Sequence, residues 1–293
     1  MYDIAVVGGG PAGLSAAVQA RARNKSVLLV SGDVRDNPLY RTERVDNYLG
    51  FYNRSGRELL EAFRSHADAM GVQLREGRVL NILPVGDTFY LSIGSEVEQA
   101  RAVVLATGVA RGRKFPGEAE YLGRGVSYCA TCDGMLYRNR EVVVVGRAAD
   151  APHEANYLRE LGCKVTYVSA QPPEGLRPDI PFVKGNRVEI QGGRNVEAVR
   201  VDRATIPCEG VFILRSSMAP DDLMAGLELE NGYIRTGRDG ATAIPGVFAA
   251  GDCTGVPLQV SKAVGEGQVA GHRAAEYCDA QQREEKTEDK ERM

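Results

Sequence analysis

The chain has 293 residues, of which 43% are hydrophobic and 26% charged, and its formal net charge is −3. This length and apolar content suffice for a large core and favour two domains. The mildly acidic balance argues against nucleic acid as a partner, and six cysteines are too few for a disulfide scaffold. No apolar run approaches membrane-spanning length, and a strand expected at the very start leaves no room for a signal peptide. A cytoplasmic location is therefore expected.

The first predicted elements form a strand–turn–helix–strand unit. A β-branched apolar run over 2–7 predicts a strand, 11–23 a helix with proline in its first turn, and 26–30 a second strand. The turn between them carries glycines in the GxGxxG spacing. These glycines permit a tight turn and close approach of a dinucleotide pyrophosphate, whose phosphates bind at the helix N-terminus. The flanking strand and helix are the context that supports such a motif.

Two later strands end in residues that suit the same cofactor. The apolar run 103–108 ends in Thr107 and Gly108, and the run 246–252 ends in Gly251 and Asp252. A carboxylate at such a strand end can bind a ribityl hydroxyl.

A second unit begins with the strand 141–145, continues through a turn at Gly146 and a helix near 150–161, and ends in the strand 164–168. Units of this kind build parallel sheets with right-handed crossovers. The predicted fold class is therefore α/β, with two nucleotide-binding, Rossmann-like domains.

Cys129 and Cys132 form a CxxC pair, and Asp133 follows directly. Such a pair can close a small disulfide, its first thiolate often has a depressed pKa, and an adjacent carboxylate can move the protons of disulfide exchange. A zinc site needs about four ligands, and the sequence has no second CxxC or HxxxH pair. Redox chemistry is favoured over zinc binding and over two inert thiols, and no metal is expected.

These motifs together resemble the low-molecular-weight thioredoxin reductases. The resemblance covers about 1–278 and includes GGGPAG, ATG, CATCDG, GVFAAGD and the GEG at 265–267. It implies an FAD domain in two pieces, 1–112 and 239–293, with a pyridine-nucleotide-type domain over 113–238 inserted and carrying the dithiol. It also implies FAD as the cofactor, a homodimer, and thioredoxin or a similar protein as the substrate.

The resemblance also assigns roles to residues. Cys132 would lie against the flavin, Cys129 further out, and Asp133 would be the acid/base. Loops 37–40 and 46–48 would line the flavin, where Tyr40 and Tyr48 either stack or simply pack. The cofactor-binding positions implied are Gly8, Gly10, Pro11, Ala12, Gly13, Ser31, Asn47, Ala106, Thr107, Gly108, Gly251, Asp252 and Gln259.

The second unit departs from the family's pattern. Ala148 replaces a glycine of the nucleotide turn, Asp150 puts a carboxylate at the helix N-terminus that can cap the helix but competes with phosphate, and 169–173 contains no basic residue. The stretch after that strand is too short for the family's next helix. Arg147 and Arg177 could meet the phosphates of a nucleotide, but both are more simply expected to be solvated surface arginines. The NADPH site is therefore predicted to be lost, as in the ferredoxin-dependent flavin thioredoxin reductases.

Under that interpretation reduced ferredoxin supplies the electrons, and basic side chains can steer such an acidic partner, although each one alone is more simply part of a mixed surface. Alternatives are an FAD-dependent dithiol oxidase using oxygen, an NADPH-dependent enzyme with an atypical nucleotide site, and a non-catalytic FAD-binding redox sensor.

Cys253 is expected to be a small buried residue, and the charged segment 279–293 a frayed helix or disordered. The candidate steering residues are Arg35, Arg41, Arg44, Arg111, Arg113 and Lys114.

Overall fold

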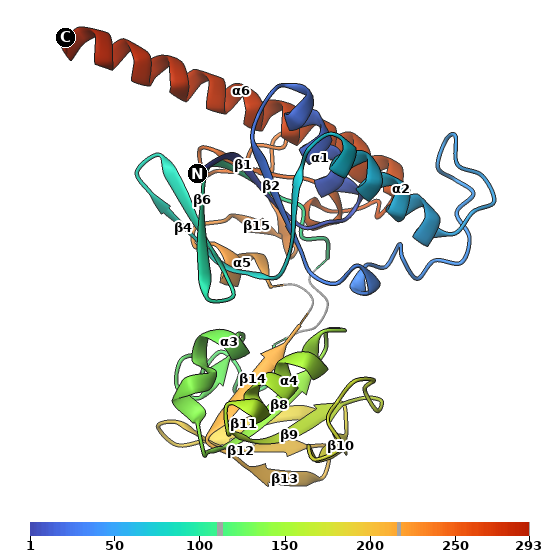
Figure 1. Cartoon of the computed structure of the whole chain (residues 1–293), viewed down its shortest axis with the longest axis vertical. Helices are drawn as coiled ribbons and strands as arrows, with labels where there is room; N and C mark the ends of the chain where they lie inside the picture. The colour runs from blue at the N-terminus through green and yellow to red at the C-terminus, as the bar shows by residue number, and fades with distance from the viewer. Residues whose placement is uncertain (110–113, 216–217, 293) are drawn as a thin grey trace. The chain divides into compact units, whose positions relative to one another are not determined.

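The computed structural model of the chain describes residues 1–109, 114–215 and 218–292. The chain divides into two compact units. Figure 1 draws them with colours that run from blue at the N-terminus to red at the C-terminus. Unit 1 comprises Met1–Ala110 and Ser217–Met293, and unit 2 comprises Arg111–Ser216. Each unit has its own parallel sheet, so the predicted α/β class with two Rossmann-like folds is confirmed.

Unit 1 is built on a seven-stranded sheet in the order β3-β2-β1-β6-β5-β4, with β17 also beside β6. Strands β1, β2, β3, β6 and β17 run parallel, whereas β4 and β5 form an antiparallel extension on β6. The strands are β1 (Tyr2–Val7), β2 (Val27–Ser31), β3 (Gln73–Glu76), β4 (Val79–Val85), β5 (Thr88–Ile93), β6 (Glu96–Leu105) and β17 (Val247–Ala249).

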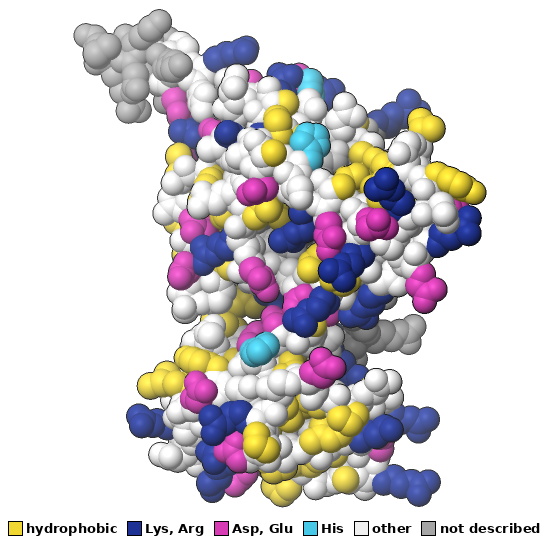
Figure 2. Space-filling model, turned by 45° about the vertical axis from the view of Figure 1, so that its right-hand side comes forward, with side chains coloured by type: hydrophobic (Ala, Val, Ile, Leu, Met, Phe, Trp, Pro, Cys, Tyr) yellow, Lys and Arg dark blue, Asp and Glu magenta, His cyan; other side chains and the backbone are white. Residues whose placement is uncertain are grey.

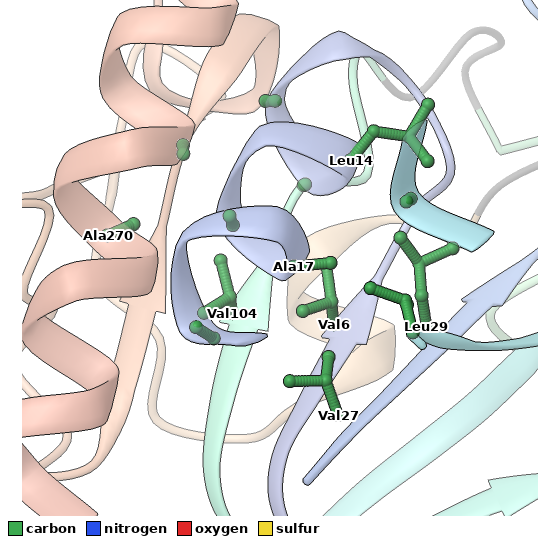
Figure 3. Close-up of a cluster of buried hydrophobic side chains, with 14 of the residues drawn as sticks. Val6, Leu14, Ala17, Val27, Leu29, Val104 and Ala270 are labelled. Atoms are coloured by element: carbon green, nitrogen blue, oxygen red, sulfur yellow. The ribbon is translucent and has the colours of Figure 1, made fainter. Parts of the chain in front are cut away.

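Alternating side chains of the central strands divide the core of unit 1 into two layers. Ile4 and Val6 point to the helical layer, whereas Ala5 and Val7 point to the opposite face of the sheet. Figure 3 shows Val6, Val104 and Leu29 of the sheet beneath Leu14 and Ala17 of α1, with α6 alongside. The helices of this unit are α1 (Pro11–Ala22), α2 (Gly56–Ala69), α5 (Pro220–Leu223) and α6 (Val260–Arg292).

Two glycines let α6 approach the backbone of α1. A Cβ atom on Gly267 would lie 2.1 Å from the carbonyl oxygen of Ala12, and one on Gly271 would lie 2.3 Å from that of Ala16. Neither oxygen can move without moving α1. The small residues on both helices thus fix where the N-terminus of α1 lies.

Helix α6 continues through the charged tail to Arg292, so of the two expectations for this segment the helix holds and disorder is wrong for 279–292. Ion pairs anchor part of the tail to the sheet side of unit 1, because Asp279 binds Lys25 and Glu285 binds Arg101. These contacts supply partners that the local composition does not reveal. No helix within 1–109, 114–215 and 218–292 is long and apolar enough to cross a membrane.

Unit 2 has a five-stranded, all-parallel sheet in the order β10-β9-β8-β14-β7. Helix α4 (Ala151–Glu160) covers one face, and the antiparallel sheet β11-β12-β13 covers the other. No helix lies between β9 and β10 in the described chain, as expected from the short connection. The strands are β7 (Val126–Ser127), β8 (Glu141–Gly146), β9 (Lys164–Ser169), β10 (Phe182–Lys184), β11 (Val188–Gly192), β12 (Val196–Val201), β13 (Ala204–Pro207) and β14 (Gly210–Leu214).

The second boundary between the compact units lies near 217, whereas the sequence analysis placed it near 238. The intervening residues form α5 and the hairpin of β15 (Leu229–Glu230) and β16 (Tyr233–Ile234). Leu223 and Ile234 from this segment are buried against Ala5 and Val7 in the core of unit 1. Their burial explains why the segment belongs to that compact unit.

The close packing of α1 and α6 makes a stability prediction. Gly271→Ala places a methyl group against the backbone of α1 and should destabilise the protein by about 1–3 kcal/mol. Gly265→Ala is the matched control, since its Cβ meets nothing within 4 Å and alanine favours a helix by about 1 kcal/mol over glycine. Urea unfolding followed by circular dichroism compares the two. Equal stabilities would show that the helices have room to spare.

Candidate functional site

The predicted cofactor residues of unit 1 meet at one edge of its sheet. Because β1, β2, β6 and β17 are parallel, their carboxyl ends lie at the same edge. Backbone hydrogen bonds tie these ends together: Gly8 N–H donates to Val30 (2.8 Å), Ala106 N–H to Val7 (2.8 Å) and Ala250 N–H to Leu105 (3.0 Å). The structure thus brings Gly8, Ser31, the Ala106–Gly108 segment and Gly251 into one region, as the sequence analysis expected.

Two glycines of the first turn are required by the fold itself. Gly8 has a φ of +117°, and a Cβ atom there would lie 2.2 Å from the carbonyl oxygen of Ala106. A Cβ atom on Gly13 would lie 1.9 Å from the carbonyl oxygen of Gly8. The first approach joins the ends of β1 and β6, the second holds α1 tightly against the end of β1, and neither leaves space for a side chain.

Unlike Gly8 and Gly13, Gly10 is not required to be glycine by the fold. Its φ of −84° suits any residue, and the one atom of the described chain within 4 Å of an added Cβ is Asn37 Nδ2, at 3.3 Å. Packing and backbone conformation therefore do not require glycine at this position. Open space above the start of α1 is what the close approach of a pyrophosphate requires.

The N-terminus of α1 has the chemistry to hold that group. Gly10 is the N-cap and offers no side chain, and the first turn contains no acidic residue. The first N–H groups of a helix lack intrahelical acceptors and carry the positive end of the helix dipole. The residues present therefore fit the diphosphate of FAD.

Asn37 is an additional candidate that the sequence analysis placed only within a flavin-lining loop. Its Oδ1 accepts a hydrogen bond from Leu39 N–H (2.9 Å), which fixes the orientation of the amide. Its Nδ2 donor consequently faces the open space at Gly10. Only the folded loop shows this orientation, because asparagine before proline is typical of many turns.

The second glycine turn is fixed by a small polar network. Glu266 of α6 accepts hydrogen bonds from Gly251 N–H and from the Thr254 hydroxyl, both at 2.9 Å, and the Lys262 ammonium donates to the carbonyl of Gly251 (2.9 Å). Asp252 is half-buried in this turn. Cys253 is buried, as expected, and burial raises the pKa of its thiol to about 11, which keeps it protonated.

Asn47 and Gln259 come together although 212 residues separate them: Asn47 Nδ2 donates to Gln259 Oε1 at 2.8 Å. The tyrosines of the same region pack against the protein itself. Tyr48 makes an edge-to-face contact with Phe63, with centroids 5.6 Å apart, and Tyr40 lies beneath the Arg57 guanidinium. The structure thus gives packing partners to both tyrosines that were weighed as flavin contacts.

In unit 2, Cys129 and Cys132 form a disulfide at the start of the short helix α3 (Ala130–Asp133). Cys129 is buried and Cys132 is exposed. The Cys129 sulfur accepts a hydrogen bond from Cys132 N–H at 3.0 Å. The covalent link excludes the interpretation of two separate inert thiols. Among the described residues, no cluster of three or more His, Cys, Asp or Glu side chains could hold a metal ion.

Ser127 is a residue that the sequence analysis missed. Its hydroxyl donates to Asp133 Oδ2 (2.7 Å) and accepts from Cys129 N–H (3.1 Å), so it joins the carboxylate to the dithiol turn. Ser127 is buried at the end of β7. A serine two residues before the pair is a weak signal in sequence, and the strand end gives it its role.

Tyr167 packs against Gly146, the residue at which β8 ends. A Cβ atom on Gly146 would lie 1.9 Å from the Tyr167 hydroxyl, and Tyr167 is fully buried, with a pKa raised by burial to about 12. Asp150 stands at the N-cap position of α4, but its side chain makes no capping hydrogen bond.

The expectation that Arg147 is a solvated surface residue is wrong. Its guanidinium donates to the side chain and backbone of Asn186 (3.3 and 3.2 Å) and lies 5.5 Å from the centre of the Phe115 ring. Burial lowers its pKa, with the nearby Arg215 as a second cause. Arg177 is exposed and bound to Asp179, as a surface arginine would be.

Three of the candidate steering residues are paired with carboxylates. Arg35 pairs with Asp33, Arg41 with Asp36 (3.4 Å) and Arg44 with Asp46 (2.7 Å). Figure 2 shows basic and acidic side chains interspersed over the face that it draws. Lys114 is exposed, whereas Arg111 and Arg113 lie outside the described residues.

The geometry at Gly10 separates cofactor affinity from stability. Gly10→Val should leave the folded chain intact but place a side chain in the pyrophosphate space, and FAD affinity should fall by more than tenfold. Gly13→Ala should instead destabilise the fold, because its Cβ collides with the backbone of Gly8. Flavin fluorescence titration and thermal unfolding measure the two effects. A Gly10→Val protein that purifies with a full complement of FAD would contradict the site.

Comparison with known proteins agrees with this geometry. Residues 2–267 match the pyridine nucleotide-disulphide oxidoreductase family. The thioredoxin reductase of Listeria innocua is 34% identical, over 95% of this chain and 94% of that protein. A ferredoxin-flavin thioredoxin reductase from Clostridium acetobutylicum superposes with a TM-score of 0.91 at 39% identity, over 96% of this chain and 98% of that one. A thioredoxin reductase from Gloeobacter violaceus gives a TM-score of 0.85 at 32% identity, over 95% and 94%. The chain therefore belongs to the pyridine nucleotide-disulphide oxidoreductase family, as an FAD-using enzyme of the thioredoxin reductase type.

Proposed function

We propose that this enzyme takes electrons from reduced ferredoxin rather than NADPH, and passes them through FAD and Cys129–Cys132 to the disulfide of thioredoxin or a similar protein. The observation that carries the proposal is the side-chain content of the turn after β8, where Ala148 carries a side chain and Asp150 a carboxylate at the start of α4. Arg147 of the same turn binds Asn186 and lies against Phe115. A ferredoxin-flavin thioredoxin reductase with a TM-score of 0.91 supports the same donor.

A pyridine nucleotide would meet three obstacles in this turn. Ala148 adds a Cβ where a glycine would allow backbone approach, and Asp150 brings a negative charge to the start of α4. Like charges at contact distance in a partly screened site repel by about 4 kcal/mol. The segment 169–173 offers no basic side chain for a 2′-phosphate. Together these features favour a nucleotide-type fold without its nucleotide.

The residues of the two units divide the chemistry. FAD, when bound at the α1 N-terminus, supplies the ability to accept single electrons and to pass them on in pairs. The Cys129–Cys132 disulfide accepts two electrons and two protons and opens to a dithiol. A thiolate of this pair then attacks the substrate disulfide to form a mixed disulfide. The second thiol displaces the reduced substrate and restores Cys129–Cys132.

The position of Asp133 supports a role in moving the protons of both steps. It lies next to Cys132 in the chain, and the Ser127 hydroxyl orients its carboxylate through the 2.7 Å hydrogen bond. We propose Asp133 as the acid/base, Cys132 as the flavin-side cysteine and Cys129 as the cysteine that attacks thioredoxin. A homodimer and a cytoplasmic location complete the proposal.

A donor comparison tests the proposed function. Reduced ferredoxin should bleach the flavin absorbance of the anaerobic protein and support turnover of thioredoxin, and NADPH and NADH at the same concentration should do neither.

Cys132→Ser should abolish thioredoxin turnover while the protein keeps FAD. Rapid bleaching by micromolar NADPH would refute the ferredoxin proposal. Peroxide formed from a small dithiol in air would favour the oxidase, and loss of a binding partner without any turnover would favour the sensor.

The obstacles in the turn also predict the result of a partial repair. Ala148→Gly combined with Asp150→Ser should not restore NADPH-driven reduction of the flavin, because 169–173 still lacks basic residues for the 2′-phosphate. The rate of flavin bleaching by NADPH is the measurement. Measurable NADPH turnover in this double variant would show that Ala148 and Asp150 alone exclude the nucleotide.

A further inference from the structure

Glu154 reaches from α4 to the dithiol turn. Its Oε2 accepts a hydrogen bond from Ala130 N–H at 3.3 Å. Ala130 directly follows Cys129, begins α3 and is fully buried, whereas Glu154 is half-buried in the first turn of α4. The carboxylate therefore lies beside the peptide group between Cys129 and the rest of its turn.

Three N–H groups of this turn donate to side-chain acceptors. Cys129 N–H donates to the Ser127 hydroxyl, Cys132 N–H donates to the Cys129 sulfur, and Ala130 N–H donates to Glu154. The first two acceptors lie within three residues of their donors. Glu154 is 24 residues away from Ala130, and among these three acceptors it alone carries a charge.

We propose that Glu154 is a positioning residue that sets the reducing strength of the Cys129–Cys132 pair. Reduction of the pair adds two electrons and two protons and yields two thiols, which ionise in part to thiolate. A carboxylate beside the turn disfavours that thiolate and so disfavours the reduced form. A dithiol pair whose reduced form is stabilised is a stronger oxidant. Glu154 destabilises the reduced form, so it makes the pair a stronger reductant.

The inference rests on the proposed redox role of the dithiol, and it adds the residue that regulates it. The other carboxylate in contact with the turn is Asp133, which is engaged by Ser127. Asp133 belongs to α3 itself, whereas Glu154 acts from a separate helix. Helix α4 begins just after the turn that follows β8. Its first turn carries Glu154, which binds the dithiol turn.

The test compares Glu154→Gln with Glu160→Gln. Glutamine removes the charge and keeps an acceptor oxygen for Ala130 N–H. Glu160 lies on the same helix, is exposed and pairs with Arg177 at a distance of 3.8 Å, so its variant loses the same charge away from the dithiol. Glu154→Ala removes both charge and acceptor.

The FAD-loaded proteins are equilibrated anaerobically at pH 8 with mixtures of oxidised and reduced dithiothreitol, quenched in acid, denatured and alkylated. Mass spectrometry then distinguishes the oxidised protein from the reduced one, which carries two additional labels. For Glu154→Gln we expect the equilibrium constant for reduction to rise about threefold, the usual strength of a charge at a helix start, or about 14 mV. Glu154→Ala should shift it in the same direction, and Glu160→Gln should match the parent.

An equilibrium constant for Glu154→Gln equal to that of Glu160→Gln would overturn the inference and leave Glu154 with a structural role. The readout needs neither ferredoxin nor thioredoxin, so failure of the ferredoxin proposal leaves this test intact. A pair that dithiothreitol cannot reduce in the parent protein would instead refute the redox role of the dithiol, and the inference with it.

Discussion

A turn from strand to helix can receive a phosphate only where no side chain stands over the start of the helix. This chain contains two such turns with opposite outcomes. Over the first, the space at Gly10 is bordered only by the donor group of Asn37. Over the second, Ala148 stands where the first turn has Gly10, Asp150 adds a carboxylate at the start of α4, and Arg147 is held by Asn186. The proposed choice of electron donor depends on this difference, because both turns otherwise lie in the same kind of parallel α/β unit.

The open turn is held in place by contacts far from it. The backbone of α1 is pressed against Gly8 at one end and against the glycines of α6 along its length. Gly267 and Gly271 bring α6 to within van der Waals distance of α1, so a segment more than 240 residues later in the chain fixes the helix that would bind the diphosphate. The same helix supplies Glu266, which orders the Gly251 turn.

The dithiol of unit 2 shows how a short local motif gains its properties from distant residues. Four residues close the disulfide and begin α3, but Ser127 orients Asp133 from the end of β7 and Glu154 binds Ala130 from α4. The carboxylates on two sides of the turn suit a pair that must donate electrons. In this account the second unit serves the dithiol as a scaffold, and its nucleotide-type turn is closed.

The motifs with fixed spacing could be predicted from the sequence. Glycine turns and apolar strands are encoded locally, and the predicted strands 2–7 and 164–168 agree with the observed β1 and β9 to within one residue. The residues that were missed act through tertiary contacts. Ser127 and Glu154 carry ordinary side chains whose roles appear only when β7 and α4 lie beside α3. Arg147 seemed a surface residue because no local pattern reveals Asn186 as its partner. The boundary near 217 and the helical tail likewise depend on packing against unit 1.

The central claim is that the second turn is closed to pyridine nucleotides, and calorimetric titration of the FAD-loaded protein with NADPH and NADP⁺ tests it most directly. The account predicts no saturable heat at millimolar nucleotide, since Ala148 adds a side chain and Asp150 a negative charge to the turn, and 169–173 contains no basic residue. Saturable binding with a dissociation constant in the micromolar range would contradict it.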